Sequence, residues 1–245
     1  MIEILQWSTL AACGLVAAVR FPSALRGENR ALFYIFALMT LAILLSIEAP
    51  YVAIDHALGG MNVANLILRF VIFAAIYFVG IRITKGFGAA DGYRLITGKV
   101  GMTVLAVISV AVAGLFLLMD STGSSAGLHS ISLRGGPDAI LAEYYGAAGR
   151  AYPAYVSLVL LPAMVRAVRS ALPVLVRLVA FLLALGAVAT ALTPLFPVVP
   201  PQWNPAKFVI NYTAVLCFVT GLTLIWAGRV RYGRNVAGQK TFTAK

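Results

Sequence analysis

The sequence predicts an all-α fold, a polytopic bundle of about seven transmembrane helices, and three observations lead to this prediction. Hydrophobic residues make up 61% of the 245-residue chain and charged residues only 11%, and the mean hydropathy is +0.94. A soluble domain of this composition would lack polar surface, whereas lipid solvates apolar side chains. The basic residues lie in short clusters between long apolar runs, so the net charge of +11 indicates membrane topology and no nucleic-acid partner. We therefore expect a multi-pass protein of the cell membrane, with the lipid bilayer as its solvent.

Seven apolar runs approach the ~20 residues that cross ~30 Å of hydrocarbon. They cover residues 4–19, 31–54, 62–81, 100–119, 151–165, 178–196 and 208–227. No basic residue precedes the first run, so we expect it to stay in the membrane and not to be cleaved as a signal peptide. The fifth run is short and contains Pro153 and Pro162, and a bundle of six helices is the alternative if it does not cross. All the runs belong to one transmembrane domain, residues 1–228.

Lysine and arginine residues are distributed unevenly between the two sides of the predicted bundle. Fifteen fall on the side of the C-terminus, whereas only Arg134, Arg150 and Lys207 fall on the other, and Arg69 lies within a run. Cytoplasmic segments near helix ends retain an excess of Lys and Arg. This asymmetry predicts a cytoplasmic C-terminus and, for an odd number of crossings, an N-terminus outside the cell.

Two segments of the sequence lie outside the apolar runs, a long loop and a basic tail. Residues 120–150 form the longest loop, predicted to be external, and its second half is expected to be an interfacial helix that leads into the fifth run. The tail 229–245 is basic, and its Arg229, Arg231 and Arg234 are expected to contact anionic lipid headgroups, at about 1 kcal/mol each. Docking of a membrane or cytoplasmic protein partner on this tail is the alternative.

Charged and amide side chains in the second and third runs are candidates for a ligand or ion-pair site. Glu48 and Arg69 each stand about ten residues, roughly 15 Å of helix, from the turn of the same hairpin. Charges at membrane depth are costly and face a protein interior or water, so we predict that the two residues pair. Asn62, Asn65 and Arg69 follow the i, i+3, i+7 spacing of one helical face and are expected to point into the bundle. A structural ion pair with an amide network is one interpretation, and a ligand or ion pathway is the other.

Asparagine residues in the third and seventh runs are spaced as in an internal repeat. Asn65 lies 17 residues before Arg82, and Asn211 lies 18 residues before Arg229. In a 3 + 1 + 3 arrangement, with the fourth helix linking two parallel repeats, these asparagines would lie at corresponding depths. The number and length of the helices resemble the small sugar transporters of the SWEET type, which implies a small-solute transporter as the alternative function. Asparagines that form interhelical hydrogen bonds explain the same spacing.

Residues that could form a catalytic or metal centre are sparse. The two histidines, His56 and His129, fall in predicted external loops and share no recognisable metal-ligand spacing with neighbouring acidic residues. The seventh run contains no lysine that could attach retinal. We therefore expect no catalytic residue, no metal, no cofactor and no enzymatic activity.

Three segments carry a resemblance to a known family. They are Ile47-Glu48-Ala49-Pro50 with Asp55 and Asn62-Val63-Ala64-Asn65-Leu66, then Tyr152-Pro153-Ala154-Tyr155, and last Gly221-Leu222-Thr223-Leu224-Ile225-Trp226-Ala227-Gly228-Arg229. The pattern resembles a group of uncharacterised actinobacterial integral membrane proteins with an N-terminal seven-helix region. Members of that group commonly carry a soluble cytoplasmic extension after the bundle, whereas this sequence ends at Lys245. Some lie beside genes for regulators, so the resemblance implies a non-enzymatic accessory or sensor role in the membrane, which is the expected function.

Overall fold

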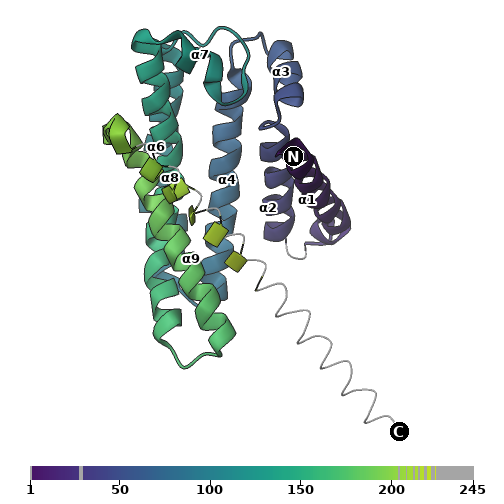
Figure 1. Cartoon of the computed structure of the whole chain (residues 1–245). Coiled ribbons are helices and arrows are strands. Elements are labelled where there is room, and N and C mark those ends of the chain that lie inside the picture. The colour runs from purple at the N-terminus through teal and green to yellow at the C-terminus, as the bar shows by residue number, and fades with distance from the viewer. Residues whose placement is uncertain are drawn as a thin grey trace.

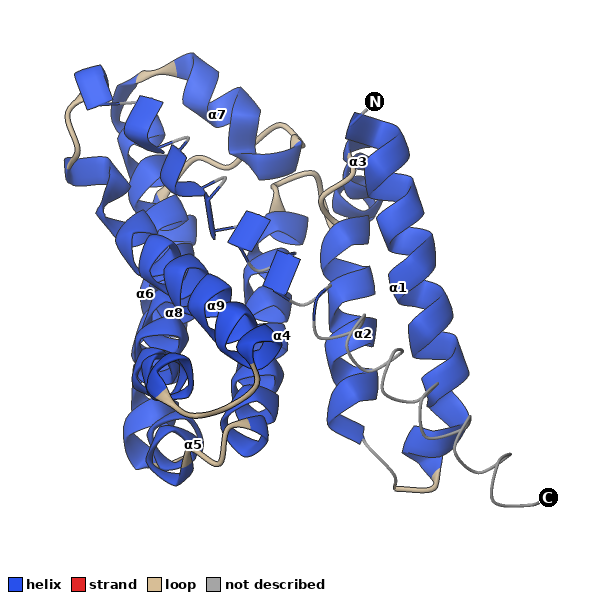
Figure 2. Ribbon diagram, turned by 60° about the horizontal axis from the view of Figure 1, so that its bottom comes forward, coloured by secondary structure: helices blue, strands red, loops and turns tan. Residues whose placement is uncertain are grey.

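The computed structural model is helical in the part of the chain that it describes, and this part contains no strand. The described residues are 2–27, 30–203, 205–207, 209–211, 213–214, 216–217, 220–221 and 224. The long helices are α1 (Ile2–Leu25), α2 (Arg30–Leu44), α4 (Val63–Gly86), α6 (Lys99–Leu118), α8 (Gly136–Arg169) and α9 (Val174–Leu192). Short helices α3 (Glu48–Ala57), α5 (Ala90–Thr97) and α7 (His129–Arg134) lie at the ends of the bundle (Figures 1 and 2). Short 3-10 helices cover Ala126–Leu128, Thr193–Val198 and Pro201–Trp203.

Five helical segments among the described residues are long and apolar enough to cross a membrane. They are Gln6–Leu25, Val63–Gly86, Lys99–Leu118, Gly136–Arg169 and Val174–Val198. Helices α2 and α3 together meet the same criterion, but a bend of 90° separates them. The described residues between 209 and 224, which belong to the seventh predicted run 208–227, are also helical. The predicted all-α fold is confirmed, and the chain has the architecture of a multi-pass membrane protein.

The second predicted run, 31–54, does not form one straight helix. Helix α2 ends at Leu44, and α3 begins at Glu48 after the bend. Pro50 explains the position of the break, because proline has no backbone N–H and its ring excludes a continuous helix through the preceding turn. In the first turn of α3, where N–H groups have no partner within the helix, the same proline is tolerated.

The fifth predicted run, 151–165, is the middle of a much longer helix. Helix α8 has 34 residues and contains both Pro153 and Pro162, so its length of about 50 Å exceeds the ~30 Å of a hydrocarbon core. Its first part occupies the second half of the predicted loop 120–150. The sequence suggested that these two prolines could interrupt the fifth run. Helix α8 continues through both, because neighbouring helices support a proline inside a membrane helix.

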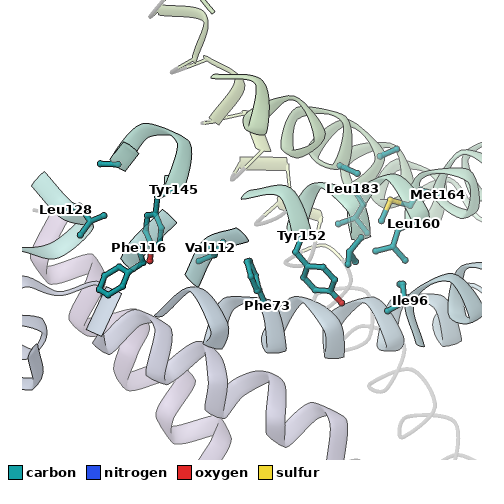
Figure 3. Packing of buried hydrophobic residues seen from close by; sticks show 14 of the residues in the cluster. Phe73, Ile96, Val112, Phe116, Leu128, Tyr145, Tyr152, Leu160, Met164 and Leu183 are labelled. Carbon is teal, nitrogen blue, oxygen red and sulfur yellow. The ribbon is translucent and has the colours of Figure 1, made fainter. Parts of the chain in front are cut away.

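Helices α4 and α8 are parallel neighbours at the centre of the bundle. From one end to the other, Asn65 bonds Tyr145, the rings of Phe73 and Tyr152 lie 5.5 Å apart, and Gly80 faces Val156. Helices α6 and α9 also pack against α8. The apolar core runs along these four helices, and Figure 3 displays its largest side chains in a row between them.

Helices α1 and α2 form a hairpin beside this central group (Figure 2). The two helices are joined at one end by the ring contact between Phe21 and Phe33, at 5.7 Å. Tyr34 of α2 stacks on Phe78 near the far end of α4, with 5.1 Å between ring centroids. The hairpin therefore docks on α4 and leaves much of α1 facing outward.

Three connections that carry described basic residues lie at the same end of the bundle, the lower end in Figure 2, which we call the basic end. These residues are Arg26 and Arg30 between α1 and α2, Arg82, Lys85, Arg94 and Lys99 around α5, and Arg166, Arg169 and Arg177 between α8 and α9. Helices α3 and α7 lie at the opposite end, which we call the cap end. The grouping of basic residues expected from the sequence thus has a single location in the described part of the fold.

Candidate functional site

A buried carboxylate organises the cap end. Asp55, in the last part of α3, is fully buried and accepts hydrogen bonds from the backbone N–H groups of Asn62, at 2.9 Å, and Ala64, at 3.0 Å. These N–H groups belong to the first turn of α4, where the helix supplies no acceptor and its dipole favours a negative charge. The hydroxyl of Ser124 donates a third bond to the same carboxylate. Asp55 therefore connects the end of α3 to the start of α4 and to the loop after α6.

The turn between α3 and α4 is shaped by glycine. Gly59 and Gly60 have φ angles of +106° and +70°, in the left-handed region that glycine enters without strain. The N–H of Gly60 donates to the backbone carbonyl of Asp55 at 2.8 Å. This tight reversal brings the start of α4 back to the Asp55 side chain.

Asn62 fixes the loop after α6 onto this turn. Its carbonyl oxygen accepts hydrogen bonds from the Tyr51 hydroxyl at 2.7 Å and the Ser125 N–H at 3.0 Å. Its amide group donates to the carbonyl oxygens of Ser121 at 2.8 Å and Gly123 at 2.9 Å. These four bonds use both donors and both lone pairs of the side chain. We call Asp55, Asn62 and residues 121–126 the polar cap.

The side chain of Asn62 carries most of the attachment of this loop, which gives a direct prediction. Asn62→Gly keeps the left-handed backbone, at φ +56° in the native chain, but loses all four bonds. We expect the free energy of unfolding to fall by about 2–4 kcal/mol. Hydrogen exchange in peptides covering residues 121–131 should accelerate, and mass spectrometry of the full-length protein in detergent measures it.

The matched control for this variant is Asn211→Ala, because Asn211 is a helical but exposed asparagine. Its exchange pattern in the 121–131 peptides should equal that of the wild type. Unchanged exchange in Asn62→Gly would contradict the assigned role of the amide.

The predicted ion pair between Glu48 and Arg69 is not formed. Glu48 is exposed, and its carboxylate accepts a hydrogen bond from the N–H of Ala126 at 3.2 Å, so it joins the edge of the polar cap. Between residues with described side chains, the single salt bridge joins Lys207 and Glu143. The prediction assumed a straight helix before the turn. The 90° bend instead turns α3, and Glu48 with it, toward the loop at the cap end.

The polar face predicted for Asn62, Asn65 and Arg69 does point into the protein, but its members serve two neighbours. Asn62 belongs to the polar cap, whereas Asn65, 1% exposed, accepts a hydrogen bond from the Tyr145 hydroxyl of α8 at 3.0 Å. The guanidinium carbon of Arg69 lies 5.3 Å from the centroid of the Tyr145 ring. The Nε atom of Arg69 is buried without a hydrogen-bond partner.

Arg150 is a charged residue close to Arg69. The sequence placed it in the predicted external loop 120–150. It lies in the middle of α8, half-buried, with its guanidinium carbon 5.3 Å from the centroid of the Phe196 ring. Asp55 was missed in the same way. The available signals were the Gly59-Gly60 turn, three to four residues before α4 starts at Val63, and the continuity of helical sequence from residue 137 into the fifth run.

The remaining predicted site residues lie elsewhere. Asn211 is exposed in its described helical segment, so its environment differs from that of the buried Asn65. Arg229, Arg231 and Arg234 lie outside the described residues. Within the part of the chain that is described, no group of three or more His, Cys, Asp and Glu residues could hold a metal ion.

The sequence matches no protein-family model, no curated protein and no solved structure in the respective comparisons.

Proposed function

We propose that this multi-pass membrane protein is a non-enzymatic accessory or sensor component of the cell membrane, and that it meets its partner or signal at the polar cap. The observation that carries the proposal is the fixed conformation of loop 121–126. Loops of this kind are usually mobile, whereas four buried or partly buried hydrogen bonds to Asp55 and Asn62 hold this one. A surface that is ordered before binding avoids the entropy cost of ordering on contact.

The outward face of the cap end has a composition suited to recognition. Leu58 and Met61, in the turn between α3 and α4, are 43% and 50% exposed. Glu48 and His56 are exposed on α3. Apolar side chains within a polar rim are typical of surfaces that contact another protein.

The polar cap is also joined to the opposite end of the molecule by a packed helix. Its carboxylate holds the first turn of α4, and α4 packs against α8 along its length before reaching Arg82 and Lys85. We propose that the basic end is cytoplasmic and the N-terminus external, because the excess of Lys and Arg then follows the positive-inside rule. The tail 229–245 would contact anionic headgroups or a cytoplasmic partner, in agreement with the proposed kinship to the actinobacterial seven-helix group.

The transporter alternative receives less support. It was suggested by asparagines in a bundle with a possible repeat, but Asn62 and Asn65 are committed to fixed protein partners. Asn211 is exposed and does not share the environment of Asn65. Residues that hold the fold together are poor candidates for a pathway that a solute must open.

The proposed orientation is tested with single cysteines at the two ends. In a background of Cys13→Ser and Cys217→Ser, His56→Cys reports on the cap end and Arg94→Cys on the basic end, since both native side chains are exposed. A membrane-impermeant maleimide should label His56→Cys in intact cells and Arg94→Cys only after permeabilisation. The reverse order of labelling would establish the inverted topology.

The proposed function is tested by photo-crosslinking in native membranes and by reconstitution. A photoreactive amino acid at Met61 should give a defined protein adduct that the Asn62→Gly change removes. The same amino acid at Val107, a 62% exposed position on α6, is the control for nonspecific neighbours. Identical adducts at both positions would count against the cap as a contact surface. Uptake of a solute by proteoliposomes of the purified protein would favour the transporter instead.

A further inference from the structure

Two arginine side chains lie along one turn of α8. Arg69 reaches across from α4 to Gly149, where a Cβ atom would stand 2.8 Å from the Arg69 Cδ and 2.9 Å from its Nε. Arg150 is the next residue of α8, and its Nη2 lies 3.7 Å from the Cβ position of Gly146. Gly146 and Gly149 are one helical turn apart, on one face. The absence of side chains at these two positions leaves the room that both guanidinium groups use.

The positive charges at this turn are not balanced by the acidic residues whose side chains are described. The positive charges of Arg69 and Arg150 repel each other, and the Glu143 carboxylate attracts Arg150. The Glu143 carboxylate, however, is 52% exposed and lies 3.9 Å from the Nζ of Lys207. The charged groups at this turn are therefore the cations Arg69, Arg150 and Lys207 and the single carboxylate of Glu143. Neither arginine has a salt bridge within the described part of the chain.

Such an arrangement is costly unless something compensates it. A guanidinium group carries five N–H donors and no acceptor, and the Nε of Arg69 is already removed from water without a partner. Aromatic rings cover one side of each group, Tyr145 for Arg69 and Phe196 for Arg150. Like charges at membrane depth repel and require a counter-charge.

We propose that Arg69 and Arg150 bind a phosphate group, carried either by the headgroup of an anionic lipid or by a soluble phosphate. The planar fork of an arginine matches the oxygens of phosphate and binds them through two parallel hydrogen bonds. Two such groups at one helical turn offer a phosphate several oxygen contacts and neutralise its charge. This inference is independent of the accessory or sensor role, because it concerns a different set of side chains.

The depth of the site suits a phosphate near the membrane surface. Arg69 is the seventh residue of α4, about 9 Å along the helix from its start. The headgroup layer occupies roughly 5–7 Å on each side of the hydrocarbon core, and arginine side chains extend toward that layer. With the polar cap at the membrane surface, both guanidinium groups fall at the boundary where lipid phosphates lie.

The test measures binding of two defined probes to the full-length protein. The first probe is radiolabelled inorganic phosphate in equilibrium dialysis with the detergent-solubilised protein. The second is phosphatidylglycerol, whose retention from mixed vesicles with phosphatidylcholine is counted by native mass spectrometry. The variants are Arg69→Gln, Arg150→Gln, their double variant and the charge-conserving Arg150→Lys. Arg82→Gln, which removes a charge from the basic end of the same helix, is the matched control.

At least one probe should bind the double variant about ten-fold or more weakly than the wild type, with Arg82→Gln within two-fold of the wild type and Arg150→Lys in between. Loss of phosphatidylglycerol alone identifies a lipid headgroup as the ligand, and loss of inorganic phosphate alone identifies a soluble one. If Arg69→Gln does not fold, the half-buried Arg150→Gln, checked by circular dichroism, decides the question. Equal binding of both probes by the wild type and a folded Arg150→Gln variant would overturn the proposal.

Discussion

Replacing Asp55 with alanine is expected to lower the free energy of unfolding by about 3–5 kcal/mol, which corresponds to a fall of about 10 °C in Tm. The carboxylate accepts bonds from two N–H groups in the first turn of α4 and from the Ser124 hydroxyl. Alanine leaves these buried donors without acceptors. It also removes a negative charge that interacts favourably with the positive end of the α4 dipole. Thermal unfolding of the full-length protein in detergent, followed by circular dichroism, measures the change.

Two further variants make this result specific. Asp91→Ala removes an exposed carboxylate from the first turn of α5 and should shift the free energy of unfolding by less than about 0.5 kcal/mol. Asp55→Asn keeps one acceptor oxygen but faces donors with its own amide, so we expect an intermediate loss. An Asp55→Ala protein as stable as Asp91→Ala would show that the buried carboxylate does not hold the cap end.

The second large effect is expected at the junction of α5 and α6. A Cβ atom on Gly101 would lie 2.6 Å from the carbonyl carbon of Ile96 and closer still to the carbonyl oxygens of Leu95 and Ile96. These are backbone atoms, and Ile96 is fully buried against Gly80 of α4. Gly101→Ala therefore forces α5 away from the bundle, at a cost above about 3 kcal/mol. Size-exclusion chromatography of a fluorescent fusion should show a loss of monodisperse protein.

Gly114→Ala is the control on the same helix, because nothing lies within 4 Å of the Cβ position there. Alanine has a higher helix propensity than glycine, so this change should be neutral or stabilising by up to about 1 kcal/mol. Similar chromatograms for Gly101→Ala and Gly114→Ala would contradict the close approach of α5 to α6.

The sequence predicted those membrane-spanning helices that consist of one continuous apolar segment. The run 100–119 corresponds to α6, Lys99–Leu118, and the run 62–81 to the first three quarters of α4, Val63–Gly86. These segments are long, apolar and free of proline, so the cost of unpaired backbone in lipid decides their structure. The break before α3 and the continuity of α8 depend on whether neighbouring helices support a proline. A hydropathy profile carries no information about these neighbours.

The candidate site was predicted in part for a similar reason. The spacing of Asn62, Asn65 and Arg69 indicated a polar face that points inward, and the structure agrees. Their partners could not be predicted, because Asn62 bonds residues 59 to 63 positions away and Asn65 bonds Tyr145, 80 positions away. A single bend between Leu44 and Glu48 was enough to separate Glu48 from Arg69. Asp55 was not predicted as a site residue, because two of its donors are backbone N–H groups, which the sequence does not distinguish.

The parallel packing of α4 and α8 has a consequence for biogenesis. Tyr145, the partner of Asn65, is synthesised 80 residues later, which takes about 4–16 s at a ribosomal rate of 5–20 residues per second. During that interval α4 has neither the hydrogen-bond partner of Asn65 nor the ring that covers Arg69. We therefore expect the final packing of α4 to form only after α8 has emerged.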